Sequence, residues 1–256
     1  MFAFATLAVW IGVMVKQARQ GNRRLVTWIY WGVLIVTVLL ADHYLLFKNI
    51  EYIHYPQYAF LALLLSKCLD PERKRFCVGK VLFWTTFLGV IDEMFQYFYL
   101  CSSYGDYLDF NDLFLNLQGA VVGTLLYYGF KSASLKKRKL SKKFFNSAGF
   151  RTIMVFIILI VFFAGSGRLK VSPSKTVPPG GIVHVDGTPM VFLERKPGIF
   201  GSWNKGAHRK GTYYVLTPGQ GLALLILAGG FFASFGRPVR QWKTLVMGEN
   251  SARVGR

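Results

Sequence analysis

Long apolar blocks separated by basic clusters are the feature that most restricts how this chain can fold. Hydrophobic residues make up 53% of its 256 residues, and they are gathered in blocks rather than scattered. Seven blocks stand out, at 1–15, 25–41, 52–69, 80–100, 113–130, 152–166 and 220–235. A lipid bilayer takes about 20 apolar residues to cross as a helix. The sequence therefore predicts an all-α fold, a polytopic transmembrane helix bundle of about seven spans.

Positive charge is distributed unevenly between the connections of these blocks. Of the 31 Lys and Arg, 22 lie in the connections 16–24, 67–80, 131–151 and 236–256. Because cytoplasmic loops are enriched in Lys and Arg, we expect these connections on the cytoplasmic side of the inner (cytoplasmic) membrane. The N-terminus is then outside and the C-terminus cytoplasmic. This placement also explains the net charge of +19, so no nucleic-acid partner is expected.

The long connection 166–220 carries eight basic residues on the predicted outer side. Asp186-Gly187 lies between two alternating segments, which predicts a β-hairpin with a type I′ turn. Residues 211–216 could add a third strand to it. The sequence thus predicts a small extracytoplasmic β-structured lobe, which could bind anionic headgroups or envelope polymers, or could be a solvated loop packed on the bundle.

The chain is predicted to have four parts. The first apolar block, residues 1–15, is short for a membrane span, so either it crosses the membrane as a short helix or the true start of the chain lies upstream. The parts are an extra N-terminal span with a basic loop (1–24), a four-helix membrane core (25–130), a cytoplasmic polybasic linker (131–151), and two further spans enclosing the lobe (152–256).

Metal and disulfide motifs are absent from the sequence. Cys68, Cys77 and Cys101 show neither CxxC nor metal-ligand spacing. No disulfide, metal or cofactor is therefore expected.

Polar residues interrupt two neighbouring apolar blocks at matching depths. Glu93 and Gln96 are spaced i, i+3, and Asp112 and Asn116 are spaced i, i+4, so each pair shares a helix face. A carboxylate at the centre of a membrane helix costs about 2.5–3.5 kcal/mol, and such groups normally face the bundle interior. Because the two predicted spans are antiparallel, we expect these side chains to meet in one outward-opening acidic cup.

Further ionisable residues lie at the same predicted face, and no catalytic residue is identified. A protonated Glu93 could hydrogen-bond Asn116, or an ionised Glu93 could await a cationic or donor-rich ligand. The alternative is that these groups serve only as interhelical hydrogen bonds. The ligand-binding candidates are His54, Glu93, Gln96, Asp109, Asp112 and Asn116, and the helix-packing candidates are Gly119 and Gly123.

One combination of motifs resembles the VanZ-like family of small bacterial membrane proteins. The pattern is Glu93-x-x-Gln96 followed by Asp112-x-x-x-Asn116-x-x-Gly119-x-x-x-Gly123, preceded by HYPQYAFLALLL, and the resemblance covers about residues 25–130. It implies a four-helix membrane unit whose namesake is linked to low-level teicoplanin resistance, with no established biochemical activity.

The chain departs from the family pattern at one position that bears on charge. The family usually carries an Arg between its Gln and its Asp, whereas 97–111 contains no Arg or Lys. If that Arg balances the acids in relatives, the cup of this chain is more negative and favours a cation or a basic ligand.

The sequence leaves three classes of function open and does not predict the oligomeric state. The first is a non-enzymatic envelope protein that binds membrane lipids, a cell-wall precursor or a lipoglycopeptide antibiotic. The second is a membrane enzyme acting on a lipid-linked substrate, with Glu93 as general acid or base and His54 and Asp109 or Asp112 assisting it or holding a divalent metal. The third is a proton-coupled transporter that uses Glu93 as a relay.

Overall fold

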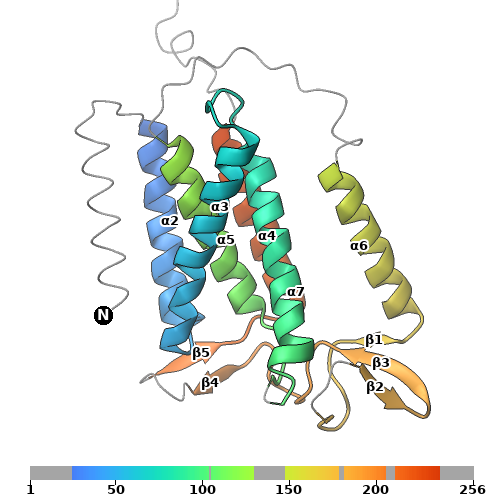
Figure 1. The fold of residues 1–256 in the computed structure, drawn as a ribbon. Helices are drawn as coiled ribbons and strands as arrows, with labels where there is room; N and C mark the ends of the chain where they lie inside the picture. Colours follow the sequence, from blue (N-terminus) through green and yellow to red (C-terminus); the bar gives the residue numbers. More distant parts are fainter. Residues whose placement is uncertain (1–24, 104, 130–147, 179–181, 206–210, 237–256) are drawn as a thin grey trace, which may run out of the picture.

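The computed structural model describes residues 25–103, 105–129, 148–178, 182–205 and 211–236. Within these residues the chain forms six α-helices that run side by side, with two small sheets at one end (Figure 1). The helices are α2 (Leu25–Tyr44), α3 (His54–Leu69), α4 (Val78–Phe95), α5 (Phe110–Tyr128), α6 (Ala148–Gly165) and α7 (Pro218–Ala233). Shorter helical turns are η1 (Asn49–Ile53), the π-helical η2 (Gln96–Leu100) and η4 (Ser234–Gly236).

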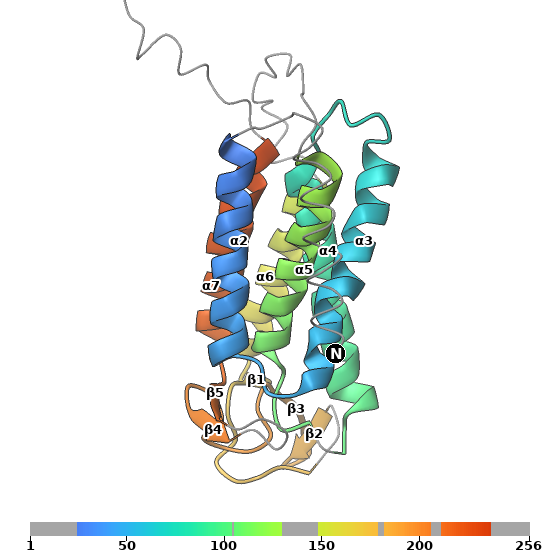
Figure 2. The same ribbon diagram turned by 90° about the vertical axis from the view of Figure 1, so that its left-hand side faces the viewer.

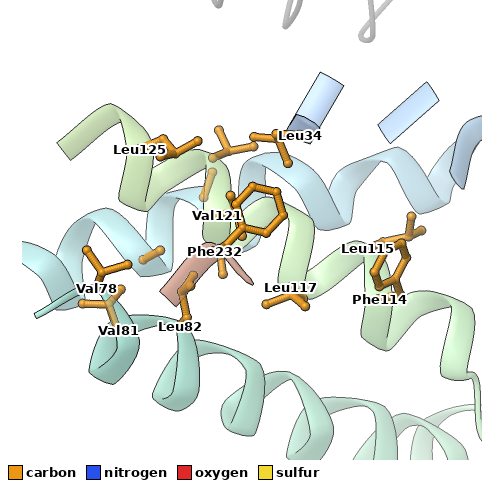
Figure 3. Close-up of a cluster of buried hydrophobic side chains, with 14 of the residues drawn as sticks. Leu34, Val78, Val81, Leu82, Phe114, Leu115, Leu117, Val121, Leu125 and Phe232 are labelled. Atoms are coloured by element: carbon orange, nitrogen blue, oxygen red, sulfur yellow. The ribbon is translucent and has the colours of Figure 1, made fainter. Parts of the chain in front are cut away.

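Helix α5 is the central helix of the core. It packs against α2, α3, α4 and α7, and 16 of its 19 residues are buried (Figure 2). Apolar side chains from several helices meet along it (Figure 3). They include Leu34 of α2, Val81 and Leu82 of α4, Leu117 and Val121 of α5, and Phe232 of α7.

Two glycines allow α3 to approach α5 at backbone distance. A Cβ atom on Gly123 would lie 2.1 Å from the carbonyl oxygen of Ala59, and one on Gly119 would lie 2.9 Å from the carbonyl oxygen of His54. Side chains do not tolerate such distances, so the absence of a Cβ at both positions sets the spacing of the two helices.

Helix α6 lies at the edge of the molecule, apart from the helices that surround α5 (Figure 1). None of its residues is buried. It meets α4 through an edge-to-face contact of Phe156 with Phe87, whose ring centroids are 5.3 Å apart. Nearly all of its apolar surface is therefore left uncovered by the described residues.

The residues after α6 form two separate small sheets. In the first, β3 (Thr188–Phe192) pairs antiparallel with β2 (Ile182–Val185) and parallel with β1 (Leu169–Lys170). Asp186 and Gly187 join β2 to β3 with φ angles of 51° and 75°, as a type I′ turn requires. The second sheet pairs β4 (Trp203–Lys205) with β5 (Thr212–Tyr214), so the suggested third strand at 211–216 does not join the hairpin. We call residues 166–217 the lobe.

The prediction of an all-α bundle with seven membrane spans is wrong. The described residues form six helices and two sheets, and only two helical stretches, Thr27–Tyr44 and Ala148–Gly165, are long and apolar enough to cross a membrane. The block 113–130 is apolar because α5 is enclosed by protein, and α3 and α7 have only 16 residues each. The expected first span and most of the polybasic linker lie outside the described residues, as do both termini.

The close approach of α3 and α5 predicts that Gly123→Ala destabilises the protein by about 1–3 kcal/mol, because the added methyl group forces the helices apart. Thermal unfolding of the detergent-purified chain measures this loss. Gly32→Ala on α2 is the matched control, since a Cβ there meets no atom within 4 Å. Equal unfolding temperatures of the two variants would contradict the assigned role of Gly123.

Candidate functional site

Four polar side chains from three helices meet at the end of the core that carries the sheets. His54 is the first residue of α3, Glu93 lies in the last turn of α4, and Asp112 and Asn116 lie in the first two turns of α5. The lobe and the connections between α2 and α3 and between α4 and α5 lie at this same end (Figure 1). We call His54, Glu93, Asp112 and Asn116 the polar cluster.

Asn116 links the histidine of the polar cluster to one of its acids. Its Oδ1 lies 2.7 Å from His54 Nδ1, and its Nδ2 donates a hydrogen bond to Glu93 Oε1 at 3.3 Å. An amide oxygen only accepts hydrogen bonds, so the proton in the first contact is on His54 Nδ1. The other ring nitrogen, Nε2, lies 3.4 Å from Asp112 Oδ2.

The polar cluster is almost closed to solvent. Asn116, Glu93 and His54 are 0%, 4% and 7% exposed, and the Asp112 side chain is 15% exposed. Asp112 Oδ1 is buried and has no hydrogen-bond partner among the described residues. Within the same residues, the ion pairs of Glu93 and Asp112 are formed with His54 alone. Two carboxyl groups are therefore buried beside a single titratable base, an arrangement that is costly unless one acid is protonated or further positive charge is supplied.

Three residues of the polar cluster carry atoms that can bind a metal ion and that lie close together. The ligand atoms of His54, Glu93 and Asp112 all lie within 4.8 Å of each other. Imidazole and carboxylate groups together suit divalent cations such as Zn²⁺ and Mn²⁺. The same groups can also exchange a proton, because His54 lies between the two carboxylates.

Two further acids lie next to the polar cluster and have structural partners. Asp109 caps α5 by accepting hydrogen bonds from the backbone N–H groups of Asn111 and Asp112. Burial raises the pKa of Asp109 well above its ordinary value, and the carboxylates of Asp112 and Glu51 raise it further. Burial also raises the pKa of Glu51 from 4.5 to about 7, assisted by Asp112 and opposed by hydrogen bonds from the preceding loop.

Gln96 does not join the polar cluster. Its Nε2 donates to Asp92 Oδ2 at 3.1 Å, and the hydroxyl of Tyr58 donates to the same oxygen at 3.0 Å. The Tyr58 ring stacks on the His54 ring with centroids 6.3 Å apart. Asp92 and Tyr58 therefore form a second layer beside the cluster. Sequence reasoning missed Tyr58, although its i, i+4 spacing from His54 places both on one face of α3.

Arg195, which follows β3, anchors the lobe to the connection between α4 and α5. Its guanidinium donates to the carbonyl oxygens of Ser102 and Tyr97, at 2.7 Å each, and to that of Gly105 at 3.2 Å. It also lies 4.2 Å from the centre of the Tyr97 ring. The lobe thus brings an arginine to the segment 97–111, which has none of its own. Because its partners are carbonyl groups, Arg195 does not neutralise the acids of the cluster.

Comparison of the chain with protein-family models, curated proteins and solved structures found no match. The resemblance to the VanZ-like family therefore stays a prediction.

The raised pKa of Glu51 predicts that stability falls as the pH rises. The folded state favours protonated Glu51, so this contribution is complete below pH 4.5 and is lost as the pH passes about 7. In buffer with a chelator, we expect the free energy of unfolding of wild type to fall by about 1–2 kcal/mol between pH 5 and pH 8, and that of Glu51→Gln to fall less. Thermal unfolding across this range measures the effect. Glu72→Gln, an exposed acid, is the control, and equal pH dependence in all three proteins would contradict the prediction.

The contacts of Arg195 predict that Arg195→Met loosens the lobe. The variant leaves three carbonyl groups without their hydrogen-bond donor, so its free energy of unfolding should be lower by about 2–4 kcal/mol. Limited proteolysis of the purified chain should then cut within 166–217 faster than in wild type. Lys196→Met is the matched control because Lys196 is exposed. If both variants are cut at the wild-type rate, Arg195 does not anchor the lobe.

Proposed function

We propose that this chain is an integral membrane protein of the bacterial cell envelope that binds the polar head of a lipid-anchored envelope molecule or an acylated glycopeptide antibiotic at the polar cluster. The observation that carries the proposal is the burial of Glu93 and Asp112 with His54 as their only ion-pair partner among the described residues. Such a site is completed by a ligand that supplies positive charge or hydrogen-bond donors. Asp112, the most exposed of the four side chains, is the point of first contact.

The apolar surface of the helices supports a membrane location. Helix α6 has no buried residue, and its Val161 and Phe162 are 64% and 62% exposed. On α2, Val36 and Leu39 are 55% and 62% exposed. Apolar patches of this extent require a covering partner, and the acyl chains of a bilayer provide one along the full length of both helices.

The position of the lobe supports binding at one membrane surface. The lobe and the polar cluster lie at the same end of the helices, whereas the α3–α4 connection lies at the opposite end (Figure 1). By the distribution of Lys and Arg among the connections, the end of the helices that carries the lobe faces the outer side of the membrane. Exposed basic residues of the lobe suit the phosphate or carboxylate groups of envelope molecules. They are Arg168, Lys170, Lys175, Lys196 and Lys205.

Substitution of the buried acids tests the proposal. Asp112→Asn and Glu93→Gln each remove one negative charge and keep the size of the side chain. We therefore expect the teicoplanin susceptibility of expressing cells to differ from that with wild type by up to about tenfold. A tenfold change corresponds to about 1.4 kcal/mol of binding free energy. Minimal inhibitory concentrations are compared at matched membrane levels of protein. Asp106→Asn, an exposed acid of the α4–α5 connection, should behave as wild type. Susceptibility equal to wild type in both buried variants contradicts an antibiotic ligand.

A second candidate function is a membrane enzyme acting on a lipid-linked substrate. It is favoured by the 3.4 Å separation of His54 Nε2 and Asp112 Oδ2, which resembles a general base with its orienting acid. Incubation of the purified chain with polyprenyl-linked substrates distinguishes the two. Turnover that is lost in His54→Gln supports the enzyme, and unchanged substrate supports binding alone.

A further inference from the structure

We infer that His54, Glu93 and Asp112 together bind one divalent transition-metal cation, of the Zn²⁺ or Mn²⁺ class, with Asn116 as the neighbour that orients two of the ligands. The inference concerns the same residues as the proposed function, but it stands on their geometry alone and does not require a lipid or antibiotic ligand.

The hydrogen bonds of Asn116 determine which ring nitrogen of His54 is free to bind a ligand. Asn116 donates to Glu93 and accepts from His54, which puts the proton of a neutral imidazole on Nδ1. The lone pair of Nε2 then points towards Asp112 Oδ2, 3.4 Å away. A lone pair and a carboxylate oxygen repel each other unless positive charge lies between them. Either a second proton or a metal cation fills that position.

The distances favour the metal cation over the second proton. An N–H···O hydrogen bond has its mode at about 2.9–3.0 Å, whereas two ligands bound tetrahedrally at about 2.0–2.1 Å lie roughly 3.4 Å apart. The separation of His54 Nε2 and Asp112 Oδ2 is 3.4 Å. Glu93 completes a set of three ligand atoms within 4.8 Å of one another.

The groups around these ligands match the usual surroundings of a metal site. Metal-binding histidines normally donate their other ring N–H to a carbonyl or carboxylate oxygen, which fixes the ring, and Asn116 Oδ1 is such an acceptor for His54. Ligating carboxylates normally accept a hydrogen bond as well, and Glu93 accepts one from Asn116 Nδ2. Asp112 Oδ1, buried without a hydrogen-bond partner among the described residues, is a second free ligand atom.

The charge and the burial of the polar cluster also favour a bound divalent cation. With neutral His54, the two carboxylates carry two negative charges, which one divalent cation balances. The four side chains are between 0% and 15% exposed, so an ion held by them is almost enclosed by protein. Three protein ligands also leave a coordination position for water or for an oxygen of a bound molecule. If the proposed function holds, that position is open to an oxygen atom of the bound polar head.

Metal uptake by the full chain tests the inference. The detergent-purified protein is stripped with chelator, dialysed against Zn²⁺ or Co²⁺ alone, and its metal content is measured by mass spectrometry. We expect about one equivalent in wild type, a visible Co²⁺ absorption band, and at least tenfold weaker binding in His54→Gln and Asp112→Asn. Asp106→Asn, outside the polar cluster, should bind one equivalent.

A second readout keeps the test valid if a variant folds poorly. Zn²⁺ should raise the unfolding temperature of wild type and of Asp106→Asn but not that of Asp112→Asn. Folded wild type that binds less than a tenth of an equivalent overturns the inference, as does full binding by both His54→Gln and Asp112→Asn. Because no lipid or antibiotic is present in the metal assay, one-equivalent binding by a chain whose buried-acid variants leave susceptibility unchanged contradicts an antibiotic ligand and leaves the metal site standing.

Discussion

The backbone contact between α3 and α5 is the constraint on which the site depends. Helix α3 lies so close to α5 at Gly119 that a Cβ there would be 2.9 Å from the carbonyl oxygen of His54. Three residues earlier on α5, Asn116 therefore reaches the imidazole of His54 directly. A wider helix spacing would separate these groups, and Asn116 could no longer hold His54 and Glu93 at once. The packing of two small residues thus determines the geometry of the polar cluster.

The lobe is attached to the end of the core at which this cluster lies (Figure 1). Asn111 at the start of α5 donates to the carbonyl oxygens of Leu45 and Tyr214 and accepts from the backbone of Leu216, which joins α2, α5 and the end of the lobe. Arg195 makes a second attachment on the α4–α5 connection. Both attachments are made to backbone groups, so they hold chain segments in place without adding charge next to Glu93 or Asp112. Among the described residues, the acids of the cluster therefore form their ion pairs with His54 and not with the lobe.

Sequence periodicity predicted part of this arrangement and failed where two partners were equally possible. The spacing of Glu93 and of Asn116 along antiparallel helices indicated that they share a depth, and the two residues are hydrogen-bonded. Gln96 lies three residues from Glu93 and four from Asp92, and periodicity alone could not decide between them. The role of Arg195 arises from a contact 90 or more residues away in the chain. Such a contact leaves no local signal.

The count of membrane spans failed for a related physical reason. A helix enclosed by other helices and a helix enclosed by lipid both need apolar residues on most faces, so an apolar block in the sequence does not by itself show what encloses the helix. What separates them is the polar content and its partners. Helix α5 contains Asn111, Asn116 and Gln118, each hydrogen-bonded to another part of the chain. Helix α6 has no buried residue and needs no such partner. The polar residues of α5 thus mark the helix that the protein itself surrounds, and one of them, Asn116, belongs to the polar cluster.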